Sequence, residues 1–176
     1  MTEFAAFLRG VNLGKRTVKS ADLVAAFVGM GFPDARTLIA SGNVLFEAEE
    51  APGLAARIER GLAEAFGFEI GTVLRRRQAL RDMVRLDPFK AVPADADAKL
   101  YVALLHEPFG RKLTLPFAVP GDFDVLAATD YDIFAVAWHM PNGRYGEGLD
   151  ALGRQFPKGT LITMRNWNTI AKAAGL

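Results

Sequence analysis

The stretch FAAFLRGVNLG, residues 4–14, decides how the first half of the chain is interpreted. Its first five residues are wholly apolar, which predicts a short strand buried on both faces. Arg9 and Asn12 follow directly, among glycines that permit a tight turn. Arginine and asparagine are poor core residues but good ligands for anions and amides. The stretch therefore predicts a buried strand whose end carries a candidate binding loop.

Helix and strand patterns alternate on the C-terminal side of this stretch. Helical spacing of apolar residues begins after Ser20, which we expect to be an N-cap, and returns between residues 52 and 67. Ser41-Gly42 is typical of a two-residue hairpin connection. Strand patterns cover three further stretches, 36–40, 43–47 and 69–74. Residues 1–75 therefore have the predicted order βαββαβ, which is ferredoxin-like.

The second half is predicted to repeat this order, with an irregular Pro/Gly stretch at 108–121 in place of the first helix. The remaining patterns predict helices at 77–86, 149–156 and 167–174 and strands at 99–105, 123–128, 133–138 and 160–163. We predict an α+β fold of two ferredoxin-like (βαββαβ) halves with mainly antiparallel sheets. The expected parts are an N-terminal half at 1–76, a helix and linker at 77–98, and a C-terminal half with a closing helix at 99–176.

Composition limits the classes of function. The chain has 176 residues, 51% of them hydrophobic and 23% charged, which is ample material for a core. A formal net charge of +1 disfavours a surface for duplex nucleic acid, which needs a dense cationic face. The chain has no cysteine and its N-terminus has no leader pattern, so we expect a cytoplasmic protein. No apolar run approaches the roughly 18 residues of a membrane span, so no membrane partner is expected.

Topology predicts where a site would form. In a ferredoxin-like sheet the first and third strands are antiparallel neighbours, so the end of one lies beside the start of the other. Arg9 and Asn12 are therefore expected near Ser41 and Asn43. Lys15 adds a cation in the same loop.

Arg75 is expected at the opposite edge of that sheet, because it ends the fourth strand. It begins a basic run with Arg77, and Arg81 and Arg85 continue that run on one face of the following helix. Such a stripe either binds phosphate or carboxylate groups or is a solvated face.

Two alternatives stay open at the first loop. Gly10 to Lys15 resembles a phosphate loop, but only three residues separate its glycines and Arg16 follows Lys15, so the nucleotide-binding pattern is excluded. A turn with exposed amides and nearby cations can still bind an anion, and it can equally be a solvated turn. Ser41-Gly42-Asn43 can likewise be only a hairpin.

The string TMRNWNT, residues 163–169, is the most unusual in the chain. Asn166 or Asn168 can cap the closing helix, and Trp167 is expected to be largely buried against the second half. Arg165 has no local partner in the sequence, which makes it a further candidate for ligand binding.

Conventional catalytic patterns are absent from the sequence. The two histidines, His106 and His139, each follow a strand with no spaced His, Asp or Glu companion, so no metal site is expected. The scattered acidic residues give no carboxylate pair. No cofactor is expected.

The ordered motifs LRGVNLG, SGNV and TMRNWNT, with Gly31-Phe32, Arg36-Thr37 and Pro88-Phe89 between them, resemble the bacterial family known as domain of unknown function 1697. The resemblance covers essentially the whole chain. It implies two ferredoxin-like halves, no established activity, and signature positions at Arg9, Asn12, Ser41, Asn43, Arg75 and Arg165. Relatives tend to have Gly-x-Ser-Lys where this chain has Gly146-Glu147-Gly148-Leu149, so any binding role of that Ser-Lys pair is in question here.

Three hypotheses for function follow. The first is a protein that binds a small anionic or amide-bearing ligand at the edge formed by the first and third strands. The second is a hydrolase or transferase that uses Arg and Asn to stabilise developing negative charge. The third is a nucleic-acid-associated module, which would bind more weakly as salt increases.

Overall fold

The computed structural model describes residues 1–12, 14, 16–39, 42–109 and 113–176. Contacts group the chain into two compact units. Unit 1 comprises Met1–Asp82 together with Ala171–Leu176, and unit 2 comprises Met83–Ile170. The division falls inside helix α3 (Arg77–Leu86) and inside helix α5 (Trp167–Ala174).

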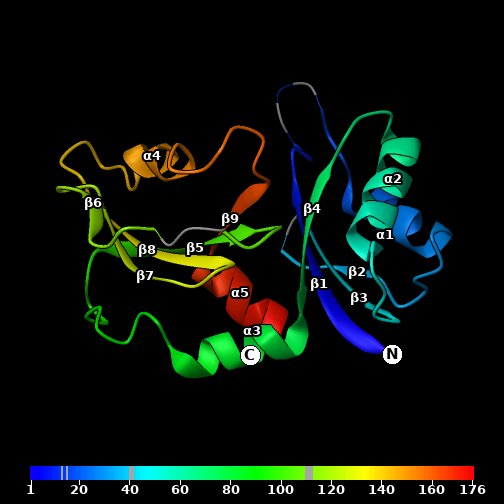
Figure 1. Cartoon of the computed structure of the whole chain (residues 1–176), viewed down its shortest axis with the longest axis horizontal. Coiled ribbons are helices and arrows are strands. Elements are labelled where there is room, and N and C mark those ends of the chain that lie inside the picture. Colours follow the sequence, from blue (N-terminus) through cyan, green and yellow to red (C-terminus); the bar gives the residue numbers. More distant parts are fainter. Residues whose placement is uncertain (13, 15, 40–41, 110–112) are drawn as a thin grey trace. The chain divides into compact units, whose positions relative to one another are not determined.

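Unit 1 contains a four-stranded antiparallel sheet in the order β2-β3-β1-β4. Its elements in chain order are β1 (Thr2–Arg9), α1 (Ser20–Gly29), β2 (Arg36–Thr37), β3 (Asn43–Ala48), α2 (Leu54–Phe66) and β4 (Gly71–Arg76). Helices α1 and α2 lie together on one face of the sheet (Figure 1). This order is the ferredoxin-like order expected from the sequence.

Alternation along β1 separates two faces of this sheet. Phe4, Ala6 and Leu8 point into a core with the helical residues Phe27 and Ile58. Within that core Phe27 and Phe46 pack with ring centroids 5.3 Å apart. The opposite face carries Ala5, Phe7 and Arg9, of which the first two are buried and the arginine is exposed. A buried strand therefore ends in an exposed cation.

Unit 2 contains a five-stranded antiparallel sheet in the order β6-β7-β8-β5-β9. Its elements are β5 (Ala98–Leu105), β6 (Phe117–Val119), β7 (Phe123–Ala128), β8 (Asp132–Trp138), the 3₁₀ turn η1 (Glu147–Leu149), α4 (Asp150–Gly153) and β9 (Ile162–Asn166). The order β7-β8-β5-β9 repeats β2-β3-β1-β4 of unit 1. The α+β fold in two mainly antiparallel halves is therefore confirmed.

The core of unit 2 lies between its sheet and α4, where Phe123, Ile133 and Leu152 are buried. Phe89 packs against Phe134 and against Trp167, with ring centroids 6.0 Å and 5.1 Å apart. Trp167 is partly buried rather than exposed, which is compatible with the expected packing of its indole on the second half. The two rings meet edge to face, with planes 68° apart, and Trp167 keeps part of its surface in solvent.

Several element boundaries differ from the sequence pattern. Strand β2 is two residues long because Ile39 has a φ of 45°, which interrupts the ladder. Ser20 is the first residue of α1 rather than its N-cap, and Lys19 takes the cap position without a side-chain hydrogen bond. The helix expected at 149–156 is shorter, with η1 followed by the single turn of α4.

Within the described ranges, no helix is long and apolar enough to cross a membrane.

Candidate functional site

The end of β1 meets the start of β3, as the topology requires. Phe7 is opposite Asn43 in the ladder, and the Leu8 amide donates to the Gly42 carbonyl at 2.8 Å. We call this place, formed by Arg9, Gly10, Asn12, Gly42 and Asn43, the β1/β3 end. Leu8 and Gly42 are therefore neighbours although they are far apart in the sequence, and Arg9 follows Leu8 directly.

The two asparagines of the β1/β3 end stabilise its loops. Asn12 Oδ1 accepts a hydrogen bond from the Val18 amide at 3.1 Å, which closes the loop after β1. Asn43 is buried, and its Nδ2 donates to the carbonyls of Leu38 and Ile39 at 3.1 and 3.3 Å. The second contact binds the carbonyl of Ile39, whose backbone is left-handed with a φ of 45°. Both asparagine side chains therefore stabilise loop backbone, Asn12 in the loop after β1 and Asn43 in the loop before β3.

Arg9 differs from these asparagines. It is the last residue of β1, its side chain is exposed, and it stands opposite Gly71 in the ladder with β4. No residue in the described ranges is recorded as a hydrogen-bond or ion-pair partner of its guanidinium. Because glycine has no side chain, the space beside Arg9 on the β4 side is not filled by its ladder partner.

Arg75 lies farther along the sheet of unit 1, and Arg165 belongs to unit 2. Arg75 is opposite Ala5, four residues along β1 from Arg9, which is about 13 Å at the rise of a strand. Its Nη1 donates to the Leu74 carbonyl at 2.9 Å. Arg165 is in β9 of unit 2, opposite Val102.

The environment of Arg165 contains local partners that the sequence did not reveal. Its Nη1 donates to Thr163 Oγ1 at 2.7 Å and to the Met164 carbonyl at 2.8 Å. Burial lowers the pKa of Arg165 to about 10, because desolvation disfavours the charged guanidinium. The residue still carries its charge at neutral pH.

The remaining candidates, Lys15 and Ser41, lie outside the described residues. Their places in the chain, in the loop after β1 and directly before Gly42, border the β1/β3 end.

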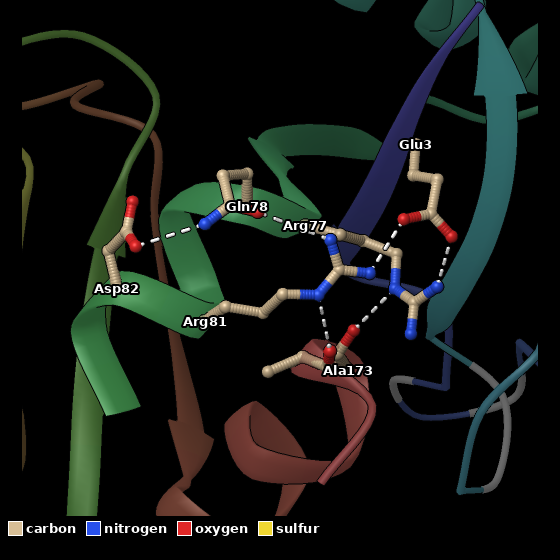
Figure 2. A network of polar contacts seen from close by, with 7 residues as sticks. Glu3, Arg77, Gln78, Arg81, Asp82 and Ala173 are labelled. Carbon is tan, nitrogen blue, oxygen red and sulfur yellow. Dashed lines mark hydrogen bonds and ion pairs between the residues drawn. The ribbon is translucent and has the colours of Figure 1, made fainter. Parts of the chain in front are cut away.

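Two arginines of the stripe on α3, Arg77 and Arg81, are engaged within unit 1, whereas Arg85 is exposed. Arg77 is buried, and its Nε donates to the Ala173 carbonyl at the end of α5 at 2.8 Å. Arg81 donates to the Ala174 carbonyl at 3.2 Å. Both guanidinium groups also pair with Glu3 of β1, Arg81 at 2.6 Å (Figure 2). We call this network the Glu3 clamp.

The Glu3 clamp explains why the last six residues belong to unit 1. Cations at a helix C-terminus are stabilising because they face the negative end of the helix dipole. Gly175 ends the helix with a φ of 94°, and a Cβ there would lie 2.7 Å from Arg77 Nη2. The positive φ favours glycine at this position, and a larger residue would also have to displace the Arg77 guanidinium.

A hollow of about 680 Å³ in unit 1 lies beside the start of α2. Its walls carry Arg57 and Arg60 but also Glu47 and Glu49, so the charge is mixed. Arg57 is already engaged, since it donates to the Met30 carbonyl and lies 5.0 Å over the Phe32 ring. This hollow is a weaker candidate for anion binding than the β1/β3 end.

A polar cluster in unit 2 was missed by the sequence analysis. His139 Nδ1 lies 2.9 Å from Asp97 Oδ2, so the expectation that His139 has no acidic companion was wrong. The Tyr145 hydroxyl donates to the other oxygen of Asp97. Asp97 is 42 positions away in the chain, and only the pairing of β5 with β8 brings it to His139. In the part of the chain that is described, no group of three His, Cys, Asp or Glu residues is placed to hold a metal ion.

Comparison with known proteins decides the family. A family model described as "Protein of unknown function (DUF1697)" matches residues 1–130. The chain belongs to the DUF1697 family. The match includes the β1/β3 end, Arg75 and Asp97, and it stops before His139, Tyr145 and Arg165.

A solved structure similar to this DUF1697 protein is that of the conserved bacterial protein SP0830 from Streptococcus pneumoniae. The two chains are 19% identical, with a TM-score of 0.65, and the similarity covers 99% of this chain and 97% of that one. At this identity the likeness shows the fold alone. A search of curated proteins found no match.

Proposed function

We propose that this DUF1697 protein is a cytoplasmic protein that binds a small anionic ligand at the β1/β3 end, with Arg9 as its principal charged contact. The observation that carries the proposal is the exposed guanidinium of Arg9 at the end of a buried strand, with no partner recorded among the described residues. A planar guanidinium fork matches carboxylate and phosphate groups.

The charge around Arg9 supports this choice. The last three residues of β1, the first two of β3 and the first three of β4 include no carboxylate. Glu3 and Glu47 face each other at the opposite end of the β1–β3 ladder. An anion at the β1/β3 end would therefore meet no carboxylate from these strands, and the Glu59 carboxylate of α2, near the start of β4, already accepts the Thr72 amide at 2.8 Å.

The loops supply the remaining features of a binding site. Gly10 has a φ of 84°, which gives the turn after Arg9 a shape that other residues rarely adopt. Asn12 and Asn43 hold the adjoining loops in place through the hydrogen bonds described above. Lys15 and Ser41 complete the proposed set from their positions in the sequence, whereas Arg75 lies about 13 Å along the same sheet from Arg9 and Arg165 belongs to unit 2.

A thermal-shift screen tests the proposal. Inorganic phosphate, organic phosphates and small carboxylic acids are added to the wild type and to Arg9→Ala, Arg9→Lys and Arg154→Ala. A ligand at one hundred times its Kd should stabilise the wild type by about 2.7 kcal/mol. Arg9→Ala should lose a contact of about 1.5–3 kcal/mol, and Arg9→Lys should lose part of it because the fork is gone.

Arg154→Ala is the matched control, because Arg154 is an exposed arginine of unit 2. It removes the same charge and should respond to ligand as the wild type does. If no anion stabilises the wild type, or if one stabilises Arg9→Ala equally, the β1/β3 end is not an anion site.

A further inference from the structure

The end of β8 in unit 2 carries an ordered histidine. Ala98 pairs with Trp138 as the first rung of the β5–β8 ladder, and the His139 amide donates to the Asp97 carbonyl at 3.0 Å. Asp97, directly before β5, is thus fixed beside His139, directly after β8. An isolated antiparallel bridge between His139 and Tyr145 closes the loop that follows. All these contacts lie within unit 2.

The carboxylate of Asp97 fixes the imidazole of His139. One carboxylate oxygen faces His139 Nδ1 at 2.9 Å, and the other accepts the Tyr145 hydroxyl. The imidazole also stacks on the Tyr145 ring, with centroids 5.0 Å apart and planes 29° apart. The neutral imidazole then carries its proton on Nδ1, and Nε2 keeps a lone pair.

The cluster is accessible. The His139 side chain is 43% exposed and that of Asp97 is 65% exposed. Exposed ion pairs add little to folding stability, so stability alone does not account for a three-membered arrangement around one histidine. No residue in the described part of the chain is recorded as a partner of His139 Nε2, which is therefore available to a bound molecule.

A cation packs on the same tyrosine ring as this imidazole. Lys99 Nζ lies 4.4 Å from the centroid of the Tyr145 ring, the same ring on which His139 stacks. Lys99 is opposite Ala137 in the ladder, two residues before His139, so both side chains leave the same face. The Tyr145 hydroxyl stays protonated at neutral pH, because its bond to the Asp97 carboxylate raises the tyrosine pKa.

We propose that His139 is the general base of a hydrolytic site for small carboxylic esters, with Asp97 as its positioning residue and Lys99 as the stabiliser of the oxyanion. A base held by a third group is the arrangement that activates a nucleophile in acyl transfer. Here the nucleophile is water. This activity is independent of the anion site proposed in unit 1.

The reaction balances without a further reagent. His139 Nε2 takes a proton from water as the water oxygen bonds to the ester carbonyl carbon, and the carbonyl electron pair moves to oxygen. The Lys99 ammonium stabilises that oxyanion. The oxyanion then collapses, the bond to the alkoxy oxygen breaks, and the leaving alkoxide takes the proton from Nε2. The products are one carboxylic acid and one alcohol.

Hydrolysis of p-nitrophenyl acetate tests the proposal, because the chain has only two histidines. His139→Gln should remove the activity, and the matched control His106→Gln should leave it unchanged. We expect the wild type to exceed free imidazole at equal concentration at least tenfold. Lys99→Met should lower kcat with a smaller effect on KM, since the oxyanion forms only in the transition state.

A second set of variants tests whether Asp97 positions the His139 imidazole, with a measurement that a purely structural role of Asp97 would not change. Asp97→Asn should lower kcat at least tenfold and move the His139 proton from Nδ1 to Nε2, which nitrogen NMR of the imidazole detects. Asp97→Glu should restore part of the rate. Circular dichroism confirms that each variant is folded.

Three results would overturn the proposal. The first is a wild type no faster than free imidazole, and the second is a His139→Gln variant that keeps the wild-type rate. The third is a burst of one p-nitrophenol per chain that marks an acylated histidine, because it would make His139 a nucleophile rather than a general base.

Discussion

Units 1 and 2 share one strand order but differ in the segment that connects two equivalent strands. This segment joins β1 to β2 in unit 1 and β5 to β7 in unit 2. Unit 1 uses helix α1, which places Phe27 in the core between sheet and helices. Unit 2 uses residues 106–122, whose described part contains only the three-residue strand β6. The sheet order therefore does not depend on a helix in the first crossover, because a short strand at the sheet edge can take its place.

The first prediction tests how much the helix contributes. Phe27→Ala should cost about 3–5 kcal/mol, because the side chain is fully buried against Phe32 and Phe46. Phe117→Ala in β6 should cost less than half as much, since that ring is half-buried. Urea denaturation measures both values, with hydrogen exchange of each sheet to separate the units. Equal costs would mean that β6 is as important to unit 2 as α1 is to unit 1.

The second prediction concerns the Glu3 clamp, which has no counterpart described within unit 2. Glu3→Gln should cost about 1.5 kcal/mol, the low end for charge-assisted hydrogen bonds, because the Glu3 side chain is 40% exposed. Glu64→Gln, which removes an exposed carboxylate of α2, is the control.

The same clamp predicts a pH dependence. The hydrogen bond from Arg81 and the charge of Arg77 lower the pKa of Glu3 below its usual value. A lowered pKa means that the stabilisation is complete above the ordinary glutamate value of about 4.3 and is lost as the pH falls through the folded value. Denaturation between neutral pH and pH 3 should show this loss in the wild type. Glu3→Gln should lack that part of the acid loss, and an unchanged profile would contradict the clamp.

The third and smallest prediction compares the starts of two helices. Asn166 Oδ1 accepts the Asn168 amide at 2.9 Å and caps α5, whereas α1 begins without a side-chain cap. Asn166→Ala should therefore cost about 1 kcal/mol, and Ser20→Ala should change stability by less than 0.5 kcal/mol. Thermal unfolding distinguishes the two. A larger cost at Ser20 would show that its hydroxyl has a role that the structure does not assign.

The sequence predicted those parts of the fold that periodicity encodes. The apolar run of β1 and the repeat of Leu54, Ile58 and Leu62 in α2 led to the correct strand order of unit 1. The short length of β2 was not predicted, because the left-handed backbone of Ile39 does not change the hydrophobic pattern. The 3₁₀ turn η1 was not predicted either, because its glycine-rich segment has no hydrophobic periodicity.

The sequence predicted which chain segments meet but not the contacts of their side chains. Antiparallel pairing brings the end of β1 to the start of β3, with Phe7 opposite Asn43, and this follows from topology alone. The bonds of Asn12 and Asn43 to loop backbone depend on local geometry, and the contact of Asp97 with His139 depends on the exact register of β5 and β8. A register one residue away would turn both side chains to other neighbours.

Titration of nitrogen-labelled protein with phenyl phosphate, followed by NMR, tests whether the β1/β3 end binds an anion. We expect shift changes to gather at Arg9 Nε and at the amides of Gly10, Val11, Gly71 and Thr72, and we expect Arg9→Ala to abolish them while Arg154→Ala preserves them. Shift changes that spare these positions, or that persist in Arg9→Ala, would contradict binding at the β1/β3 end.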